Sequence, residues 1–282
     1  MNKIIQDELS KQLKLAEGNS KKIRSPLKWA GGQYSILEDI KKKLPKSSRL
    51  IEPFLGSGVV FMNTNYDHYT LNDKNNDLIT FYKILKKEGE KFIEYCREHF
   101  YPTLNNEEKY YEIREKFNAS SEDKAQKSAL FLYRYNSSGN YNVPFGRYKS
   151  TYFPEQEMRL FWKKSKRAAF LSKDFQKVML SAQEGDVIYC DPPYVPLSNT
   201  SNFTSYNAGG FDAEEQKDLA SISERISKQG VTVLISNHYT AFTEKIYSEA
   251  NTHTLLSVRR LISCNGSNRK NAKEILALYL PS

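Results

Sequence analysis

The chain has few of the residues that build covalent or metal-based frameworks. Its 282 residues include only three cysteines and four histidines. The cysteines lie far apart and show no CxxC spacing, which argues against a disulfide framework or a structural zinc (Cys96, Cys190, Cys264). Four scattered histidines give a metal centre little to build on, so we expect no bound metal.

Long apolar runs are also missing. No uninterrupted run approaches the roughly 20 residues needed to span a bilayer, so a membrane partner is not expected. The N-terminus lacks the apolar core of a signal peptide, and the predicted address is therefore the cytoplasm. The length of 282 residues predicts one large domain, or one domain with an insertion.

Acidic residues are missing from two stretches of a chain whose net charge is +9. Neither Asp nor Glu occurs in residues 124–154 or in residues 255–273, although both stretches contain Lys and Arg. The first also carries eight aromatic residues between Phe131 and Phe153. Net charge alone leaves open a merely solvated basic surface. Basic residues interleaved with aromatic ones favour a surface that meets phosphates and unstacked bases.

The pattern of apolar residues predicts an α/β protein with a parallel or mixed sheet. Strands are expected at 49–52, 69–72, 186–190 and 231–236, with paired strands at 253–262 and 273–280. Helices are expected at 58–64, 75–100 and 212–228. Residues 101–155 interrupt the alternation and are rich in Tyr, Asn and Ser, which indicates an insertion into the sheet.

A glycine turn follows the first expected strand. It contains Gly56 and Gly58 and leads into a helix, and glycines there let the backbone approach a ligand closely. Asp73 ends the next strand, where a carboxylate in a nucleotide-binding sheet accepts hydrogen bonds from ribose hydroxyls. The plainer interpretations are a simple strand-to-helix turn and, for Asp73, a helix N-cap.

The sharpest feature is the segment Asp191-Pro192-Pro193-Tyr194, directly after an apolar strand. Successive prolines remove N–H donors and hold the backbone extended. Asp191 and the Pro192 carbonyl can then accept the N–H hydrogens of an exocyclic amine, which favours the pyramidal nitrogen that attacks a methyl group. Tyr194 offers a flat ring for stacking on a base. The alternative is a proline-rich surface turn with a solvated Asp.

Five motifs together resemble the Dam-type DNA adenine-N6 methyltransferases, the alpha group of the D12 class. They are PLKWAGG at 26–32, EPFLGSG at 52–58, LND at 71–73, NVPFGRYK at 142–149 and DPPY at 191–194. The resemblance covers residues 26–280. It implies a Rossmann-like S-adenosylmethionine-dependent methyltransferase sheet with an inserted, mainly helical DNA-recognition domain that carries a β-hairpin. The expected division is an N-terminal extension at 1–24, a catalytic domain at 25–75 and 156–282, and a recognition domain at 76–155.

The same resemblance implies roles for single residues. S-adenosylmethionine would be bound by Trp29, Gln33, Phe54, Gly56, Gly58, Asp73 and Asp191. The target adenine would be held by Asp191, Pro192 and Tyr194. Double-stranded DNA would be contacted by Lys28, Arg134, Asn136, Asn142, Pro144 and Arg147. Arg134 would read guanine and Pro144 would touch a thymine methyl within GATC. A monomeric bacterial or phage enzyme at the nucleoid is expected.

The sequence departs from the family in two places. Gln33 stands where the family usually has Lys, which predicts cofactor binding without charge assistance. About ten residues of the recognition hairpin that the family normally carries are absent between Tyr133 and Arg134. Either the hairpin is truncated, or the printed chain omits a flexible loop.

Two alternatives use the same motifs. DPPY suits any planar amine, so RNA adenine N6 or DNA cytosine N4 could be the acceptor. A catalytically impaired DNA-binding homologue would keep the fold but lack activity. Direct attack by the amine needs no covalent enzyme intermediate, so Cys190 is interpreted as a buried strand residue. His238, at a strand end, is interpreted as structural or at the rim of the site.

Overall fold

The computed structural model describes residues 22–29, 33–100, 106–118, 124–138, 152–195, 211–259 and 271–282. The chain divides into two compact units. The helical unit comprises Met1–Tyr34, Gly56–Asn65 and Asn75–Phe170, and the sheet unit comprises Ser35–Leu55, Tyr66–Lys74 and Leu171–Ser282.

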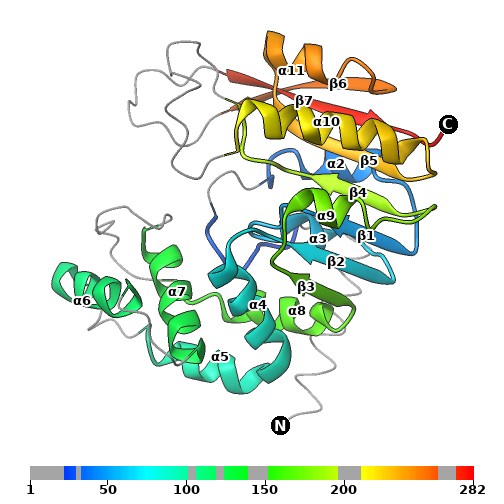
Figure 1. The fold of residues 1–282 in the computed structure, drawn as a ribbon. Coiled ribbons are helices and arrows are strands. Elements are labelled where there is room, and N and C mark those ends of the chain that lie inside the picture. Colours follow the sequence, from blue (N-terminus) through cyan, green and yellow to red (C-terminus); the bar gives the residue numbers. More distant parts are fainter. Residues whose placement is uncertain are drawn as a thin grey trace. The chain divides into compact units, whose positions relative to one another are not determined.

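Seven strands of the described residues form one sheet in the order β3-β2-β1-β4-β5-β7-β6. The strands are β1 Arg49–Glu52, β2 His68–Asn72, β3 Ala168–Leu171, β4 Val187–Cys190, β5 Thr232–His238, β6 Thr252–Arg259 and β7 Asn271–Tyr279. β1 is parallel to β2 and β4, and β4 is parallel to β5, whereas β7 is antiparallel to both its neighbours (Figure 1). The order 3-2-1-4-5 is Rossmann-like, as expected.

This strand order fixes where a ligand can bind. The chain order reverses between β1 and β4, which are neighbours in the sheet. Ligands of open α/β sheets bind outside the carboxyl ends of the strands at such a switch point. The glycine turn follows β1 and Asp191 follows β4, so both segments leave the sheet there.

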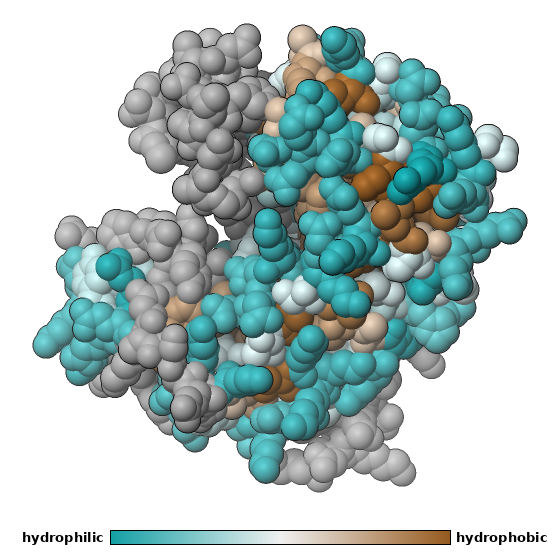
Figure 2. All heavy atoms as spheres, viewed as in Figure 1, coloured by the Kyte–Doolittle hydropathy of each residue, from teal (hydrophilic) through white to brown (hydrophobic). Residues whose placement is uncertain are grey.

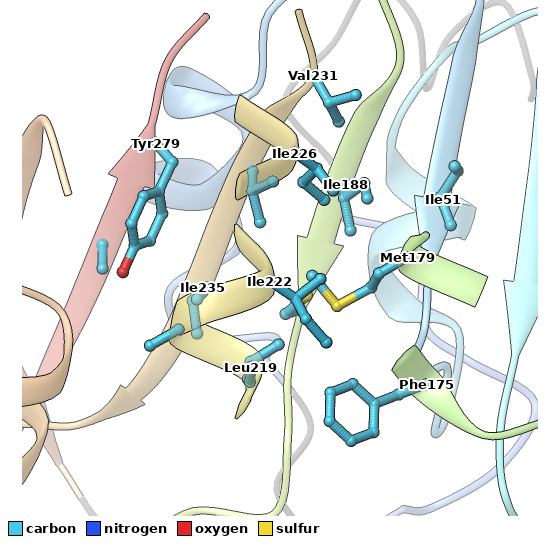
Figure 3. Close-up of a cluster of buried hydrophobic side chains, with 14 of the residues drawn as sticks. Ile51, Phe175, Met179, Ile188, Leu219, Ile222, Ile226, Val231, Ile235 and Tyr279 are labelled. Carbon is cyan, nitrogen blue, oxygen red and sulfur yellow. The ribbon is translucent and has the colours of Figure 1, made fainter. Parts of the chain in front are cut away.

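The sheet unit contains the helices α2 Leu37–Lys43, α9 Phe175–Met179, α10 Ala213–Ser227 and α11 Ala241–Ile246. Helices α9 and α10 cover one face of the sheet, and α2 lies on the other (Figure 1). Leu219, Ile222 and Ile226 recur at helical spacing on α10 and point toward β4 and β5 (Figure 3). A capping box between Asp212 and Glu215 starts α10. Most of the described surface seen in Figure 2 is hydrophilic, so the apolar side chains are concentrated inside.

The helical unit contains α3 Val59–Asn63, α4 Asn76–Glu88, α5 Glu90–Arg97, α6 Glu107–Asn118, α7 Lys124–Ser138 and α8 Glu155–Ser165. Its core is aromatic: the Tyr82 ring stacks on Phe161 with 4.4 Å between ring centroids. Asn75 begins α4 because its side chain accepts hydrogen bonds from the N–H groups of Asp77 and Leu78. No helix of the described residues is long and apolar enough to cross a membrane.

The expected strands are confirmed within one or two residues. For the strand expected at 253–262, residues 260–262 lie outside the described residues. The sheet also contains β3, which was not expected. β3 is the four-residue AAFL with lysines before and after it, too short for a periodic signal. The expectation of one helical stretch at 75–100 was wrong in one respect. Gly89, with φ 58° and ψ −122°, separates α4 from α5. The Trp162 ring fills the space beside it, where a Cβ would lie 2.1 Å from the indole.

Candidate active site

The Asp191–Tyr194 segment begins where β4 ends. All four residues of β4 are buried, so the strand places Asp191 at the carboxyl edge of the sheet core. Asp191 and Tyr194 are half-buried and Pro192 is buried. Neighbouring β1 and β5 are parallel to β4, so the loops that follow them leave the sheet at the same edge.

The backbone after Pro192 is held by side chains from α10 and β5. The Gln216 side-chain amide donates to the Pro193 carbonyl at 2.8 Å. The Val195 N–H donates to Asn237 Oδ1 at 3.2 Å, and Val195 O lies 2.7 Å from Nδ1 of His238. A carbonyl can only accept, so Nδ1 carries the hydrogen in that bond. Three polar side chains therefore fix this turn.

These tethers are themselves tied together in the interior. Asn237 Nδ2 donates to Gln216 Oε1 and to the Tyr247 hydroxyl, both at 3.0 Å. The Tyr247 hydroxyl lies 3.2 Å from Gln216 Oε1. Burial raises the pKa of Tyr247, so its hydroxyl stays protonated and able to donate. A buried hydrogen-bond network of this kind holds its members rigidly.

The turn offers two hydrogen-bond acceptors to a ligand. Among the described residues, none donates a hydrogen bond to the Pro192 carbonyl oxygen. The Asp191 carboxylate accepts from Ser236 Oγ through Oδ1 at 3.1 Å. A neutral carbonyl beside a carboxylate suits a ligand with two N–H hydrogens, such as an exocyclic amine.

The Tyr194 ring is oriented by residues from β5 and β7. It packs edge to face with the His238 ring, with 4.7 Å between centroids and 75° between planes. The Tyr194 hydroxyl lies 3.5 Å from Glu274 Oε2, at the long limit for a hydrogen bond. His238 and Glu274 are register partners on β5 and β7. His238 thus borders the turn, which agrees with its interpretation as structural or at the rim.

Buried Asn72, the last residue of β2, ties together the loops after β1 and β3. Its Nδ2 donates to the carbonyls of Pro53 and Lys173 at 2.9 and 3.0 Å, and its Oδ1 accepts from Lys173 N–H at 2.9 Å. Half-buried Asp73 follows and is fixed by its own N–H, which donates to Leu171 O at 3.3 Å. The Phe54 ring packs edge-on against Phe211, with 5.3 Å between centroids.

The helical unit holds the other residues predicted to bind the cofactor. Gly56 has φ +49°, and a Cβ built on it would lie 3.2 Å from Trp29 ring atoms. The glycine is therefore needed both for its conformation and for the close approach of the indole. Gly58, at φ 71°, caps α3. Gln33 is 5% exposed, so its amide is buried.

The predicted DNA-contacting residues are only partly described. Lys28 is exposed. Arg134 and Asn136 lie in α7, whose backbone runs as one helix through the Tyr133–Arg134 junction. The structure does not describe their side chains, and Asn142, Pro144 and Arg147 lie outside the described residues.

Sequence reasoning missed the residues that hold the site: Asn72, Tyr189, Gln216, Ser236 and Asn237. Polar residues inside apolar strands and helices were the available signal, because buried polar groups need partners. The interpretation of Cys190 agrees with the structure: its thiol is fully buried, and burial raises its pKa well above the usual range. The described residues contain no group of three His, Cys, Asp or Glu side chains that could hold a metal ion.

The Rossmann-like strand order, with Asp-Pro-Pro-Tyr directly after β4, is the arrangement expected of an S-adenosylmethionine-dependent methyltransferase. Residues 29–261 match the family described as D12 class N6 adenine-specific DNA methyltransferase, and the chain belongs to this family. It is 46% identical over 271 residues to the DNA adenine methylase of Escherichia coli (strain K12), covering 93% of this chain and 97% of that protein.

Two further relatives have the same name. The DNA adenine methylase of Vibrio cholerae serotype O1 is 46% identical over 272 residues, covering 93% of this chain and 98% of that protein. The DNA adenine methylase of Serratia marcescens is 44% identical over 270 residues, covering 92% and 99%. Family and relatives agree that the chain is an adenine-specific DNA methyltransferase.

Proposed function

We propose that this chain moves a methyl group from S-adenosylmethionine to N6 of an adenine that is flipped out of duplex DNA, within GATC. The observation that carries the proposal is the pair of acceptors at the end of β4. The Asp191 carboxylate accepts a hydrogen bond from Ser236, and the carbonyl of the next residue, Pro192, is the second acceptor. The names of the relatives support adenine in DNA as the acceptor. GATC is the site that the resemblance of the sequence motifs implies.

The two acceptors act on the amine itself. An exocyclic amine is a poor nucleophile because its lone pair is delocalised into the ring. Asp191 and the Pro192 carbonyl each accept one N–H hydrogen, which favours the pyramidal nitrogen and frees the lone pair. Asp191 is also the group placed to take up the proton that the amine loses. Tyr194, braced by His238, offers its ring to the base.

The residues present fit a nucleoside-bearing cofactor. Gly56 leaves the space beside the Trp29 indole that any Cβ would crowd. Asp73, after β2, is the carboxylate expected to accept ribose hydroxyls, and Phe54 adds an aromatic ring. Gln33, Gly58 and Asp191 complete the proposed set. When bound, the cofactor supplies an electrophilic sulfonium methyl group.

DNA recognition is assigned to the insertion. We assign residues 76–155 to the recognition domain and residues 25–75 with 156–282 to the catalytic domain. Helices α4–α7 lie in one compact unit, which also includes Gly56–Asn65 and residues 156–170. Lys28, Asn136, Asn142 and Arg147 would contact the DNA. Arg134 would read guanine with two hydrogen bonds, and Pro144 would contact a thymine methyl.

The test is transfer of labelled methyl from S-adenosylmethionine to three duplexes. One contains GATC, one contains GATC already methylated at adenine N6, and one has the same composition with GTAC instead. We expect incorporation into the first duplex only. Equal incorporation into the GTAC duplex would refute GATC specificity, and incorporation into the premethylated duplex would refute adenine N6 as the acceptor.

A fourth substrate separates the impaired homologue from the active enzyme. The alignment with the E. coli relative spans 271 residues, whereas 93% of this 282-residue chain is about 262, so the relative contains residues that this chain lacks. Binding of GATC duplex without incorporation into any substrate, including single-stranded DNA, would favour the impaired homologue. Incorporation into the single strand alone would place the defect in base flipping.

A further inference from the structure

Asp191 belongs to a hydrogen-bonded group that continues through Ser236 to Tyr189. Tyr189 and Asp191 are two residues apart along β4 and its extension, so their side chains lie on the same face of the sheet. Ser236 on β5 lies on that face too, since Tyr189 is the register partner of Leu234, two residues before it. The Ser236 hydroxyl is 2.9 Å from the Tyr189 hydroxyl and 3.1 Å from Asp191 Oδ1.

The direction of each hydrogen bond follows from a count of hydrogens. A serine hydroxyl has one hydrogen to donate, and an ionised carboxylate has none. Ser236 therefore donates to Asp191, whose oxygen is nearer than the Cys190 carbonyl at 3.4 Å. The Tyr189 hydroxyl must then donate to Ser236. The result is a one-way chain from Tyr189 through Ser236 to Asp191.

Burial keeps these hydrogen bonds between Tyr189, Ser236 and Asp191 in place. Ser236 is 0% exposed and Tyr189 is 1% exposed, so water does not compete for their hydrogens. Burial raises the pKa of Tyr189 well above its usual range, and the phenol stays protonated. A hydrogen bond to an ionised acceptor is about twice as strong as one between neutral groups. The stronger Ser236–Asp191 bond in turn polarises the Tyr189–Ser236 bond.

We propose that Ser236, backed by Tyr189, is a positioning residue for methyl transfer: it fixes the plane of the Asp191 carboxylate so that the amine meets a preset acceptor. This inference rests on the proposed function. A carboxylate on a single Cα–Cβ–Cγ stem rotates easily, and each misplaced rotamer lowers the fraction of bound base that can react. Ser236 contributes by removing that freedom and does not contact the base.

A purely structural role makes different predictions. If the pair only satisfies buried hydroxyls, its removal lowers the stability of the fold without a selective effect on the chemical step. If the hydrogen bonds from Tyr189 through Ser236 position Asp191, removing them lowers kcat at an unchanged KM for DNA. The two removals are also non-additive, because the Tyr189 hydroxyl acts on Asp191 only through Ser236.

The experiment measures kcat and KM for GATC duplex in Ser236→Ala, Tyr189→Phe, the double variant and Ser236→Thr. We expect Ser236→Ala to lower kcat roughly ten- to a hundredfold, as loss of a charge-assisted hydrogen bond does. Tyr189→Phe should lower kcat by about threefold to tenfold. The double variant should match Ser236→Ala within about twofold. Threonine keeps the hydroxyl and should recover most of the activity.

The chain offers matched controls in the sheet unit. Ser223 is a buried serine whose hydroxyl donates to Leu219 O at 2.7 Å within α10, and Ser223→Ala should retain wild-type kcat. Tyr279 is a buried tyrosine on β7 whose hydroxyl has no hydrogen-bond partner among the described residues, and Tyr279→Phe should do the same. Thermal midpoints of all variants separate loss of folding from loss of rate.

The outcomes distinguish the inference from the function beneath it. Wild-type protein that transfers no methyl to any adenine duplex overturns both. Wild-type activity together with full kcat in folded Ser236→Ala overturns the inference alone. Additive losses in the double variant, or a rise in KM with kcat intact, also overturn it. If Ser236→Ala does not fold, Tyr189→Phe against Tyr279→Phe decides the question.

Discussion

The side-chain amide of Gln216 donates a hydrogen bond of 2.8 Å to the carbonyl oxygen of Pro193. Pro193 is part of the turn that carries Asp191 and Tyr194, whereas Gln216 lies in the first turns of α10. The helix is packed on the sheet through its apolar side, so the bond ties the turn to the core (Figure 3). The packing of the helix on the sheet therefore keeps the turn rigid.

Gln216→Ala should therefore affect both stability and rate. The change leaves the Pro193 carbonyl without this donor and removes the acceptor of Asn237 Nδ2 and the Tyr247 hydroxyl. We expect a loss of about 2–3 kcal/mol in the free energy of unfolding, together with a lower kcat. Chemical denaturation and a methyl-transfer assay measure the two effects. Gln229→Ala, on an exposed residue just after α10, is the control and should change neither.

Asp191→Asn should stop methyl transfer while the fold survives. The amide keeps a neutral acceptor but loses the charge that opposes the positive charge developing on the amine. We expect kcat to fall roughly a hundred- to a thousandfold, the effect of losing one electrostatic contact in a transition state. Single-turnover transfer of labelled methyl measures this. Asp218→Asn, at an exposed position of α10, should keep full activity. Full activity in Asp191→Asn would remove Asp191 from the mechanism.

The sequence could predict the sheet because each central strand is a compact apolar run. Val187–Cys190 is entirely buried, and the prolines of DPPY after the run VIYC mark where the strand ends. Asp73 and the glycine turn could be placed for the same reason, since both follow such strands. β3 could not, because AAFL between lysine-rich segments is four residues long.

The support of the site was beyond sequence reasoning because it depends on contacts between distant residues. Tyr189 and Ser236 are 47 positions apart, and only the register of β4 against β5 brings them together. Asn72 is hydrogen-bonded to Lys173, 101 positions away in the sequence. A polar residue in an apolar strand signals that a partner exists, but the topology decides which one.

Gln33→Lys tests the departure from the family near Trp29. Gln33 is buried, and a lysine there would place an ammonium in the interior. In the absence of S-adenosylmethionine, we expect Gln33→Lys to unfold at a lower temperature than wild type, because a buried charge without a partner is costly. We expect tighter binding of S-adenosylmethionine, by roughly threefold to tenfold, because a charge-assisted hydrogen bond replaces a neutral one. Calorimetric titration measures the affinity, and an unchanged affinity would sink the idea.

Gly56→Ala tests the cofactor loop, and Gly185→Ala is its matched control. Both glycines have positive φ, +49° and +83°, so alanine at either position costs about 1 kcal/mol of backbone strain. Only at Gly56 does the new Cβ meet a ring, 3.2 Å from Trp29, whereas nothing lies within 4 Å at Gly185. The stability losses should therefore be similar, with some excess at Gly56.

The affinity for S-adenosylmethionine should separate the two variants. The Gly56→Ala methyl group displaces the indole that we propose contacts the cofactor, so we expect the Kd to rise by about tenfold or more. Gly185→Ala should bind as wild type does, because its strain is confined to a turn before β4. Calorimetric titration at a temperature where both variants are folded gives the Kd values. Equal affinities in the two variants would mean that Trp29 and Gly56 do not form the cofactor site.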